Sequence, residues 1–377
     1  MDFHFQYIEY IYYPLVGLFT LAALLQLGFY LKIYGALIKY KRAPQLKKFP
    51  ISVIICARNE AENLSKNLPS ILEQKHENFE VIVINDCSTD ETEEVLGGFL
   101  KKYKNLKITN VIPDLKFSHG KKLAITLGIK AASNEWLVFT DADCYAESEN
   151  WLERIQENYT DEKDIILGYG GYKVYPGLLN KYIRYDTIMI ALQYFGFALA
   201  GIPYMGVGRN LSYRKSLFFK NKGFAKHYEL LSGDDDLFVN ETATKNNVAV
   251  EFHPESRTLS EPKHKWKNWF NQKKRHFTTA ERYKSKHFFL LGVEPLSRFL
   301  FYLTTVFLLS LNIYRIYVLI LIGIRFLAML IFTKLAVKRL KEQQGWGYLL
   351  IFDVISLFIN FIIYLSIRFR SKKVRWK

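Results

Sequence analysis

The apolar residues of the chain form long unbroken runs near both ends and short runs between them. Residues 11–38 are almost uncharged, with Lys32 as an interruption, and this length is enough for a helix that crosses a bilayer. A cleaved signal peptide would need a basic first segment, whereas residues 1–10 carry Asp2 and Glu9 and no lysine or arginine. The pattern therefore predicts a retained N-terminal transmembrane helix.

The C-terminal part of the chain has similar long apolar runs. Residues 296–332 are apolar for about two spans, with a break near residues 312–315, and residues 348–367 form another run. Lysine and arginine follow the N-terminal run, and the positive-inside rule therefore predicts that the next part of the chain is cytosolic. Four spans would put the basic tail, residues 368–377, on the opposite side, against this rule. Either one segment is re-entrant or interfacial, or these final charges do not decide the topology.

Between the long runs, short apolar runs alternate with helical patterns. The short runs at residues 51–57, 80–84, 106–112 and 136–139 predict strands, and residues 61–72 place their apolar side chains on one face of a helix. This alternation predicts an α/β domain with a mostly parallel, Rossmann-like sheet and crossover helices. We expect four regions: an N-terminal anchor and its basic flank, the α/β domain, a basic amphipathic segment, and a C-terminal transmembrane region, at residues 1–48, 49–262, 263–292 and 293–377.

Polar residues follow the predicted strands, and the carboxyl ends of parallel strands meet at one edge of a sheet. We therefore expect Asp86, Lys121, Asp141 and Asp143 to converge on one pocket. Two carboxylates one residue apart suit a hard divalent cation that holds a diphosphate, although a solvated acidic loop would give the same pattern. The glycine motifs of dinucleotide-binding domains and of P-loop enzymes are absent from the sequence.

The overall charge makes the acidic clusters stand out, because the 377-residue chain has a formal net charge of +16. A second cluster, Asp234 to Asp236, contains three adjacent carboxylates. Their repulsion predicts that at least one pKa is raised, which suits a general base that removes a proton from a hydroxyl. An acid-rich helix N-terminus is the alternative. The three cysteines form no C-x-x-C pair, which favours reduced cytosolic residues over disulfides or a metal site.

Residues 263–286 contain nine lysines and arginines interleaved with tryptophan and phenylalanine. This pattern is typical of a helix that lies on an anionic membrane surface. Nucleic-acid binding is the rival interpretation, but the adjoining membrane span argues against it, so we expect no nucleic-acid partner.

Four motifs resemble the family 2 glycosyltransferases with a GT-A fold. In chain order they are Ala57-Arg58-Asn59-Glu60, Asn85-Asp86-x-Ser88-x-Asp90, Gly120-Lys121 and Asp141-x-Asp143. The segment Gln272-x-x-Arg275 is similar to the Gln/Arg-x-x-Arg-Trp motif of membrane-bound members such as cellulose and hyaluronan synthases and ceramide glucosyltransferase. His276 stands where those enzymes have tryptophan, which puts acceptor stacking at this position in doubt.

The resemblance implies a nucleotide-sugar donor, usually a UDP-sugar, and a Mg²⁺ or Mn²⁺ ion. It implies these donor-binding residues: Ala57, Arg58, Asn59, Glu60, Asp86, Asp141, Gln272 and Arg275. The expected position of Lys121 at the same edge of the sheet adds this residue to the donor site. Asp143 is the expected metal ligand, with Asp141 nearer the ribose or the metal. Loosely, the resemblance places acceptor contacts at Gly208, Arg209 and Asn210. Alignment of the second cluster with the family favours Asp236 as the base, and a one-residue shift would favour Asp235 instead, or Asp234.

The sequence thus predicts an inverting glycosyltransferase in the plasma membrane with a cytosolic catalytic domain. Its expected acceptor is a membrane lipid or a polysaccharide. Three or four spans are fewer than some processive synthases have, which favours single transfer over a channel for a long polymer. The alternatives are a nucleotidyltransferase-like enzyme and a non-catalytic membrane scaffold with a degenerate nucleotide site.

Overall fold

The computed structural model describes residues 2–41, 44, 47–111, 120–230, 232–343 and 346–369, and the side chains of these except residues 2–11 and 346. The predicted end of the third strand, residue 112, and most of the basic tail, residues 370–377, lie outside the described residues.

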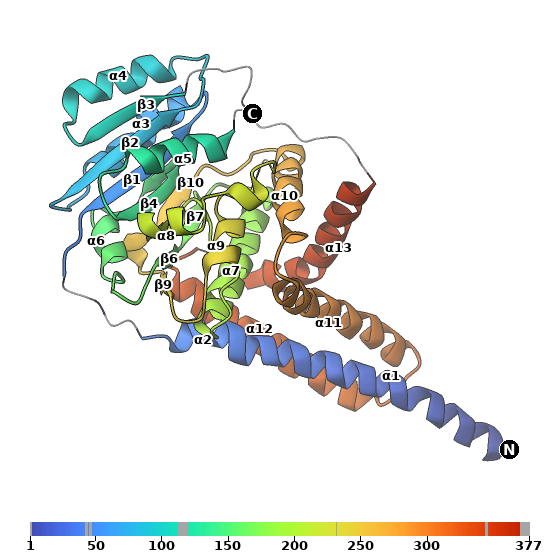
Figure 1. Ribbon diagram of the computed structural model, residues 1–377. Helices are drawn as coiled ribbons and strands as arrows, with labels where there is room; N and C mark the ends of the chain where they lie inside the picture. The colour runs from blue at the N-terminus through green and yellow to red at the C-terminus, as the bar shows by residue number, and fades with distance from the viewer. Residues whose placement is uncertain are drawn as a thin grey trace.

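A seven-stranded sheet forms the centre of the α/β domain (Figure 1). Its order is β3-β2-β1-β4-β8-β6-β9, and only β8 runs antiparallel to its neighbours, so the predicted mostly parallel sheet is confirmed. In that order the strands are Leu106–Asn110, Phe79–Asn85, Ile51–Ala57, Trp136–Asp141, Leu211–Arg214, Ile165–Gly168 and Val248–Glu251. A small second sheet joins β5 (Cys144–Ala146), β10 (Thr258–Ser260) and β7 (Gly170–Tyr172).

Alternate residues of each central strand enter two different hydrophobic cores. In β1, Val53 and Ile55 pack with α3 (Ala61–Leu72), α4 (Thr92–Lys102) and α6 (Trp151–Gln156). Ile54 faces the other way, toward α5 (Lys121–Ala131). That second core continues through α7 (Leu178–Leu199) into the membrane helices, so the sheet and the membrane region share one packed interior. Three further helices are α8 (Lys215–Lys220), α9 (Asp236–Thr242) and α10 (Trp266–Ala280).

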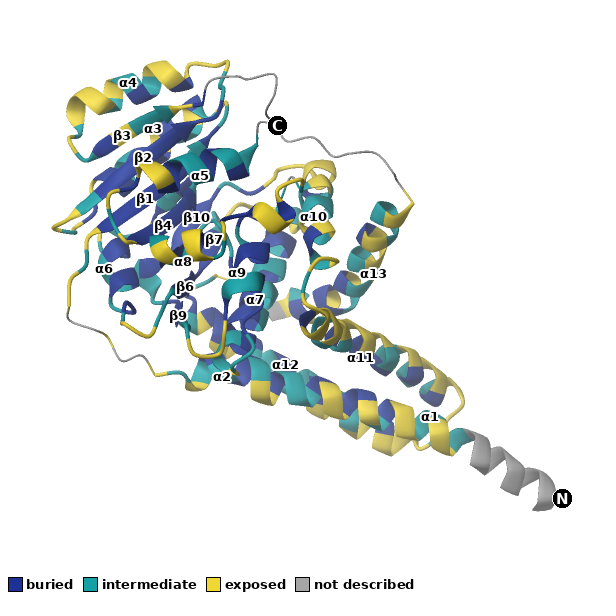
Figure 2. Ribbon diagram, viewed as in Figure 1, coloured by how far each residue is buried: buried dark blue, intermediate teal, exposed yellow. Residues whose placement is uncertain are grey.

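Four helical segments in the described chain are long and apolar enough to cross a membrane. The first comprises α1 (Asp2–Gly28), the π-helical turn η1 (Phe29–Tyr34) and α2 (Gly35–Lys39). The others are α11 (Ser285–Ser310), α12 (Arg315–Arg339) and α13 (Leu349–Arg368). α1, α11 and α12 pack together and extend away from the sheet, whereas α13 packs chiefly on α10 and α7 (Figure 1). Many positions of these four segments are exposed (Figure 2), and large apolar residues occupy many of them.

A buried polar network joins these helices. The Asp353 carboxylate of α13 lies 3.0 Å from Arg298 of α11 and 2.5 Å from Arg325 of α12. Arg325 also donates to the Gln26 side chain of α1 at 3.1 Å, and Gln26 donates to Ser297 at 2.9 Å. All five side chains are almost fully buried. Glu294 of α11, 3.2 Å from Arg298, supplies a second negative charge, so two arginines and two acids link the four apolar helices without a net buried charge.

Candidate active site

The loops after β1 and β2 are linked by hydrogen bonds into one rim of the site. The Asn59 backbone N–H donates to Ser88 Oγ at 2.9 Å, and the Ala61 N–H donates to Asp90 Oδ2 at 3.1 Å. Asn59 has a φ of +55°, a conformation that asparagine tolerates better than most residues. Ser88 and Asp90, which belong to the second motif, therefore hold the two loops together.

Asp86 directly follows β2 and is almost fully buried. Its carboxylate is 3.9 Å from the Arg58 guanidinium, and its N–H donates to the Ala57 carbonyl at 2.8 Å. Ala57 thus contributes its backbone to the site. The Glu60 carboxyl is close enough to Asp143 and Asp141 for their charges, together with burial, to raise its pKa.

Lys121, at the start of α5, connects the two acidic clusters. Its ammonium lies 2.9 Å from Asp141 and 2.9 Å from Asp234. Burial opposes the charged form, but Asp141, Asp234 and Asp235 outweigh it and hold the pKa of Lys121 well above its ordinary value. A permanently charged lysine therefore joins acids that are far apart in the sequence.

Asp141 and Asp143 follow β4 side by side, and their carboxylates lie within 4.8 Å of one another and of the Cys144 thiol. Burial raises the pKa of Asp141, but Lys121 and two arginines lower it below its ordinary value. Burial and the charge of Asp141 raise the pKa of Asp143. Such a poorly compensated pair of carboxylates suits a divalent cation.

The nearby thiol does not suit the same ion. The Cys144 Sγ lies 2.9 Å from Ser260 Oγ, and burial together with the two acids raises the pKa of the thiol well above its ordinary value. Because a thiol binds metals as thiolate, Cys144 stays outside the ligand set. The remaining donors are oxygens, which fit Mg²⁺ or Mn²⁺ better than a thiolate-binding metal.

The second acidic cluster lies across Lys121 from the first. Asp235 Oδ2 accepts the Gly208 N–H at 2.6 Å, and Oδ1 accepts the Asp236 N–H at 2.7 Å. Burial, Asp234 and Asp236 raise the pKa of Asp235 to about 7. The structure thus contains the raised pKa that three adjacent acids predict, at the middle residue of the cluster.

Asp236 has a different environment, because three donors hold its carboxylate. Oδ2 accepts from the hydroxyl groups of Thr279 and Tyr283, the latter at 2.8 Å, and Oδ1 accepts the Leu237 N–H at 2.8 Å. Burial raises the pKa of Asp236, and these hydrogen bonds oppose the rise. The side chain therefore ties the start of α9 to the end of α10.

The loop at residues 206–210 contributes to the site through two of its three predicted residues. A Cβ on Gly208 would lie only 3.2 Å from Asp235 Oδ2, so the close approach of this loop depends on glycine. Arg209 donates to the Gly171 carbonyl at 2.9 Å and lies over the Tyr172 ring at 4.3 Å. Asn210 is buried and donates to two backbone carbonyls, so the structure does not bring its amide to the cavity.

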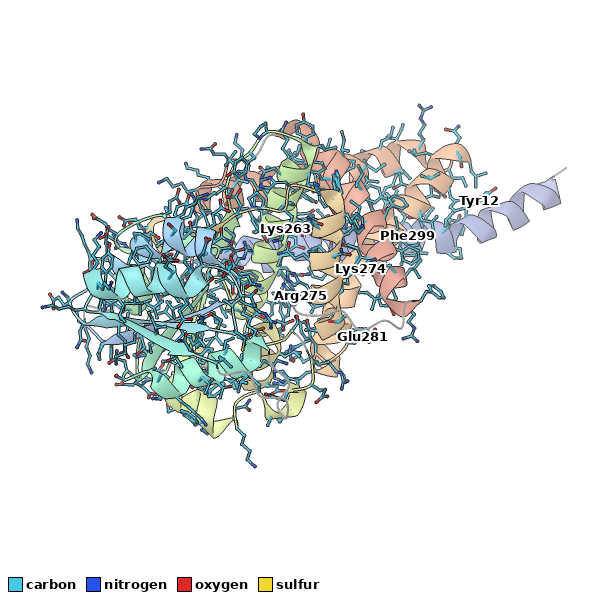
Figure 3. The ribbon with its side chains drawn as sticks, turned by 90° about the horizontal axis from the view of Figure 1, so that it is seen from above. Tyr12, Lys263, Lys274, Arg275, Glu281 and Phe299 are labelled. Atoms are coloured by element: carbon cyan, nitrogen blue, oxygen red, sulfur yellow. The ribbon has the colours of Figure 1, made fainter. Side chains whose placement is uncertain are left out.

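α10 carries Gln272 and Arg275 and lies between the α/β domain and the membrane helices (Figure 3). Both residues and His276 line a cavity of about 460 Å³. The same cavity is lined by Lys121, Asp141 and all three acids of the second cluster, and it continues to residues of α11 and α13. The structure therefore brings four predicted donor-side residues, Lys121, Asp141, Gln272 and Arg275, to one cavity with the second acidic cluster. The other predicted donor and metal residues are not among those that line it: Ala57, Arg58, Asn59, Glu60, Asp86 and Asp143.

Several residues of the site were not predicted from the sequence. Lys263 lies close enough to lower the pKa of Asp143, and Thr279 and Tyr283 hold Asp236. Glu294 and Asn360 line the far end of the cavity. Polar residues inside long apolar runs were the available signal for these last two, because such residues rarely face lipid.

The fold and the two linked acidic clusters define an α/β domain of the GT-A type. Residues 52–220 match the family model described as Glycosyl transferase family 2, and the chain therefore contains a family 2 glycosyltransferase domain. The predicted family resemblance and the predicted fold class are confirmed. Asp234 to Asp236 and α10 lie beyond the matched residues.

Known proteins agree with this assignment. A protein of Haemophilus influenzae described as an uncharacterized glycosyltransferase is 34% identical over 122 residues, which are 32% of this chain and 36% of that relative. The poly-beta-1,6-N-acetyl-D-glucosamine synthase of Staphylococcus epidermidis is 38% identical over 93 residues, 25% of this chain and 21% of that relative. The chain thus matches well under half of either relative's length.

One solved structure is similar over most of the chain. The mannosyltransferase PcManGT from Pyrobaculum calidifontis, in complex with GDP-Man and Mn²⁺, aligns with a TM-score of 0.58 and 16% identity. The alignment covers 91% of this chain and 97% of that chain, so the likeness in fold extends beyond the family 2 domain.

Proposed function

We propose that the protein is a membrane-anchored inverting glycosyltransferase that uses a nucleoside diphosphate sugar, expected to be a UDP-sugar. Its acceptor is a hydroxyl group of a membrane lipid or a polysaccharide. The observation that carries the proposal is the position of Lys121, whose ammonium joins Asp141 of one acidic cluster to Asp234 of the other. A donor held at the first cluster would therefore face a base in the second.

The four apolar segments support membrane attachment, and the basic flank after the first segment supports a cytosolic catalytic domain. In a bacterial-type cell envelope this corresponds to the inner face of the plasma membrane. The synthase from Staphylococcus epidermidis is named for a polysaccharide product, which supports a glycan or glycan-bearing acceptor here.

The donor nucleotide would lie in the rim formed after β1 and β2, at Arg58, Asn59, Glu60 and the buried Asp86. A divalent cation on Asp143, with Asp141 beside it, would offset the negative charge of the leaving diphosphate. Lys121 and Arg275 add fixed positive charge on the cavity side, and Gln272 adds an amide.

We propose Asp235 rather than Asp236 as the general base. Asp235 has a pKa of about 7, close to the pH at which a base is most effective. The carboxylate of Asp236 already accepts three hydrogen bonds, which leaves it poorly placed to take a proton. Asp236 is then a positioning residue that fixes α10 against α9.

The reaction then proceeds as a single displacement. The acceptor hydroxyl gives its proton to Asp235, and its oxygen forms a bond to the anomeric carbon. The bond between that carbon and the diphosphate breaks on the opposite face, which inverts the anomeric configuration.

The test is nucleoside diphosphate release by the purified full-length protein with a panel of UDP- and GDP-sugars, with and without Mn²⁺ or Mg²⁺. The proposal predicts cation-dependent release from at least one donor and none by D143N. Release of pyrophosphate from a nucleoside triphosphate and a sugar phosphate would instead identify a nucleotidyltransferase. A folded protein that turns over no donor would favour the scaffold interpretation.

A further inference from the structure

The cavity has a second arm, which extends from the catalytic acids to the membrane helices. Its far end is lined by Leu291, Glu294 and Pro295 of α11 and by Asn360 of α13. On the same two helices, Leu296, Phe299 (Figure 3) and Phe361 are large, apolar and exposed. The arm therefore ends at helices whose exposed faces suit lipid.

The charged side chains of this arm are already paired. Lys273 lies 2.7 Å from Asp186, and Arg298 lies 3.2 Å from Glu294 and 3.0 Å from Asp353. The cations that face the donor, Lys121 among them, lie at the opposite end of the cavity. An anionic headgroup in the arm would thus meet cations that are already paired with acids, and its desolvation cost would not be offset by a free positive charge there.

A neutral amide remains available in the arm. Among the described residues, none hydrogen-bonds to the side chain of Asn360, which interrupts the apolar run of α13 and lines the cavity. A side-chain amide can both donate to and accept from hydroxyl groups. The carboxylate of Glu294, held by Arg298, can also accept a hydrogen bond from a hydroxyl group.

The described membrane helices pack around a polar interior. Gln26, Arg298, Arg325 and Asp353 fill it with direct contacts and are almost fully buried. The cavity volume of about 460 Å³ is in the range of sites for small ligands. A lipid headgroup fits a pocket of this size.

We infer that the acceptor is an uncharged, hydroxyl-bearing membrane lipid, an inference that rests on the proposed function. Its headgroup occupies the arm, where Asn360 hydrogen-bonds to a hydroxyl that does not react. Its chains leave toward the bilayer where α11 and α13 both line the cavity. The reacting hydroxyl loses its proton to Asp235, its oxygen bonds to the anomeric carbon, and the nucleoside diphosphate departs.

The experiment uses the full-length protein in phosphatidylcholine vesicles and a donor labelled in its sugar. Each vesicle sample carries one added probe: dioleoylglycerol, a monoglycosyl dioleoylglycerol or a polyprenyl phosphate, and a further sample receives a soluble oligosaccharide. The inference predicts label in the organic phase with one or both uncharged lipids. Label that enters only the polyprenyl phosphate or only the oligosaccharide would overturn it.

Asn360→Leu provides a second readout, because leucine suits an apolar helix. Loss of its hydrogen bonds predicts a roughly tenfold higher KM for the lipid acceptor. Phe361→Leu, on the exposed face of the same helix, is the matched control and should leave this KM unchanged. Equal KM values for wild type and Asn360→Leu, with equal melting temperatures, would count against the inference. Donor hydrolysis without acceptor distinguishes failure of the lipid inference from failure of the proposed function. Its presence supports the proposed function even when lipid transfer fails.

Discussion

Asp235→Asn is the substitution that separates the proposed base from its neighbours. Asparagine keeps the size of the side chain, and its carbonyl oxygen can still accept the Gly208 N–H, now 2.6 Å from Asp235 Oδ2. It cannot accept a proton from the acceptor hydroxyl. General-base catalysis contributes about 10²- to 10⁴-fold, so we expect kcat to fall by that factor while the KM for the donor changes little.

The pH dependence of kcat/KM provides an independent test of Asp235 as the base. The pKa of Asp235 is raised to about 7, so its active, ionised form is gained as pH rises through that value. About half of the molecules carry the ionised base at pH 7 and about a tenth at pH 6. The wild-type kcat/KM should therefore drop about fivefold between pH 7 and pH 6.

Asp236→Asn is the matched control. It removes one of the charges that raise the pKa of Asp235, so the acidic limb of the pH profile should move to lower pH. It also weakens the contacts with Thr279 and Tyr283, which should lower the melting temperature. Both variants are assayed by nucleoside diphosphate release with acceptor present. The reasoning is refuted if Asp235→Asn stays within fivefold of wild type while Asp236→Asn loses a hundredfold or more.

Three other predictions follow from the same contacts. Asp143→Asn should abolish Mn²⁺-dependent donor binding, measured by calorimetry, and retained binding with an unchanged cation requirement would remove Asp143 from the metal site. Lys121→Met should raise the pKa of Asp141 and weaken donor binding, whereas Lys121→Arg should retain part of it; identical affinities in all three proteins would contradict this. Arg325→Leu should destabilise the protein by about 3–5 kcal/mol, seen as a lower melting temperature in detergent, because Asp353 loses a buried partner; an unchanged melting temperature would show that Arg298 alone suffices.

The mostly parallel sheet, and the polar residues at the carboxyl ends of its strands, were predictable because their signals are local. Apolar runs such as residues 51–57 end directly in polar motifs, and parallel strands bring those ends to one edge. The position of Asp86, Asp141 and Asp143 follows from that rule alone. The family resemblance then supplied chemistry that spacing cannot provide.

Contacts between distant parts of the chain were not predictable in the same way. The salt bridge of Lys121 with Asp234 and the pairing of Arg325 with Asp353 depend on how loops and helices pack. The family resemblance predicted that Asn210 contacts the acceptor, but in the folded chain its amide donates to two backbone carbonyls. The preference for Asp236 came from alignment, whereas the hydrogen bonds that distinguish it from Asp235 arise from α10.

The most direct test of the central claim is an experimental structure of the full-length protein with Mn²⁺ and a non-hydrolysable nucleotide-sugar analogue. The account predicts anomalous density for the cation at Asp143, the nucleotide beside Asp86 and the anomeric carbon facing Asp235 across Lys121. A nucleotide bound away from these residues would contradict the account, and so would a cation that has neither Asp141 nor Asp143 among its ligands.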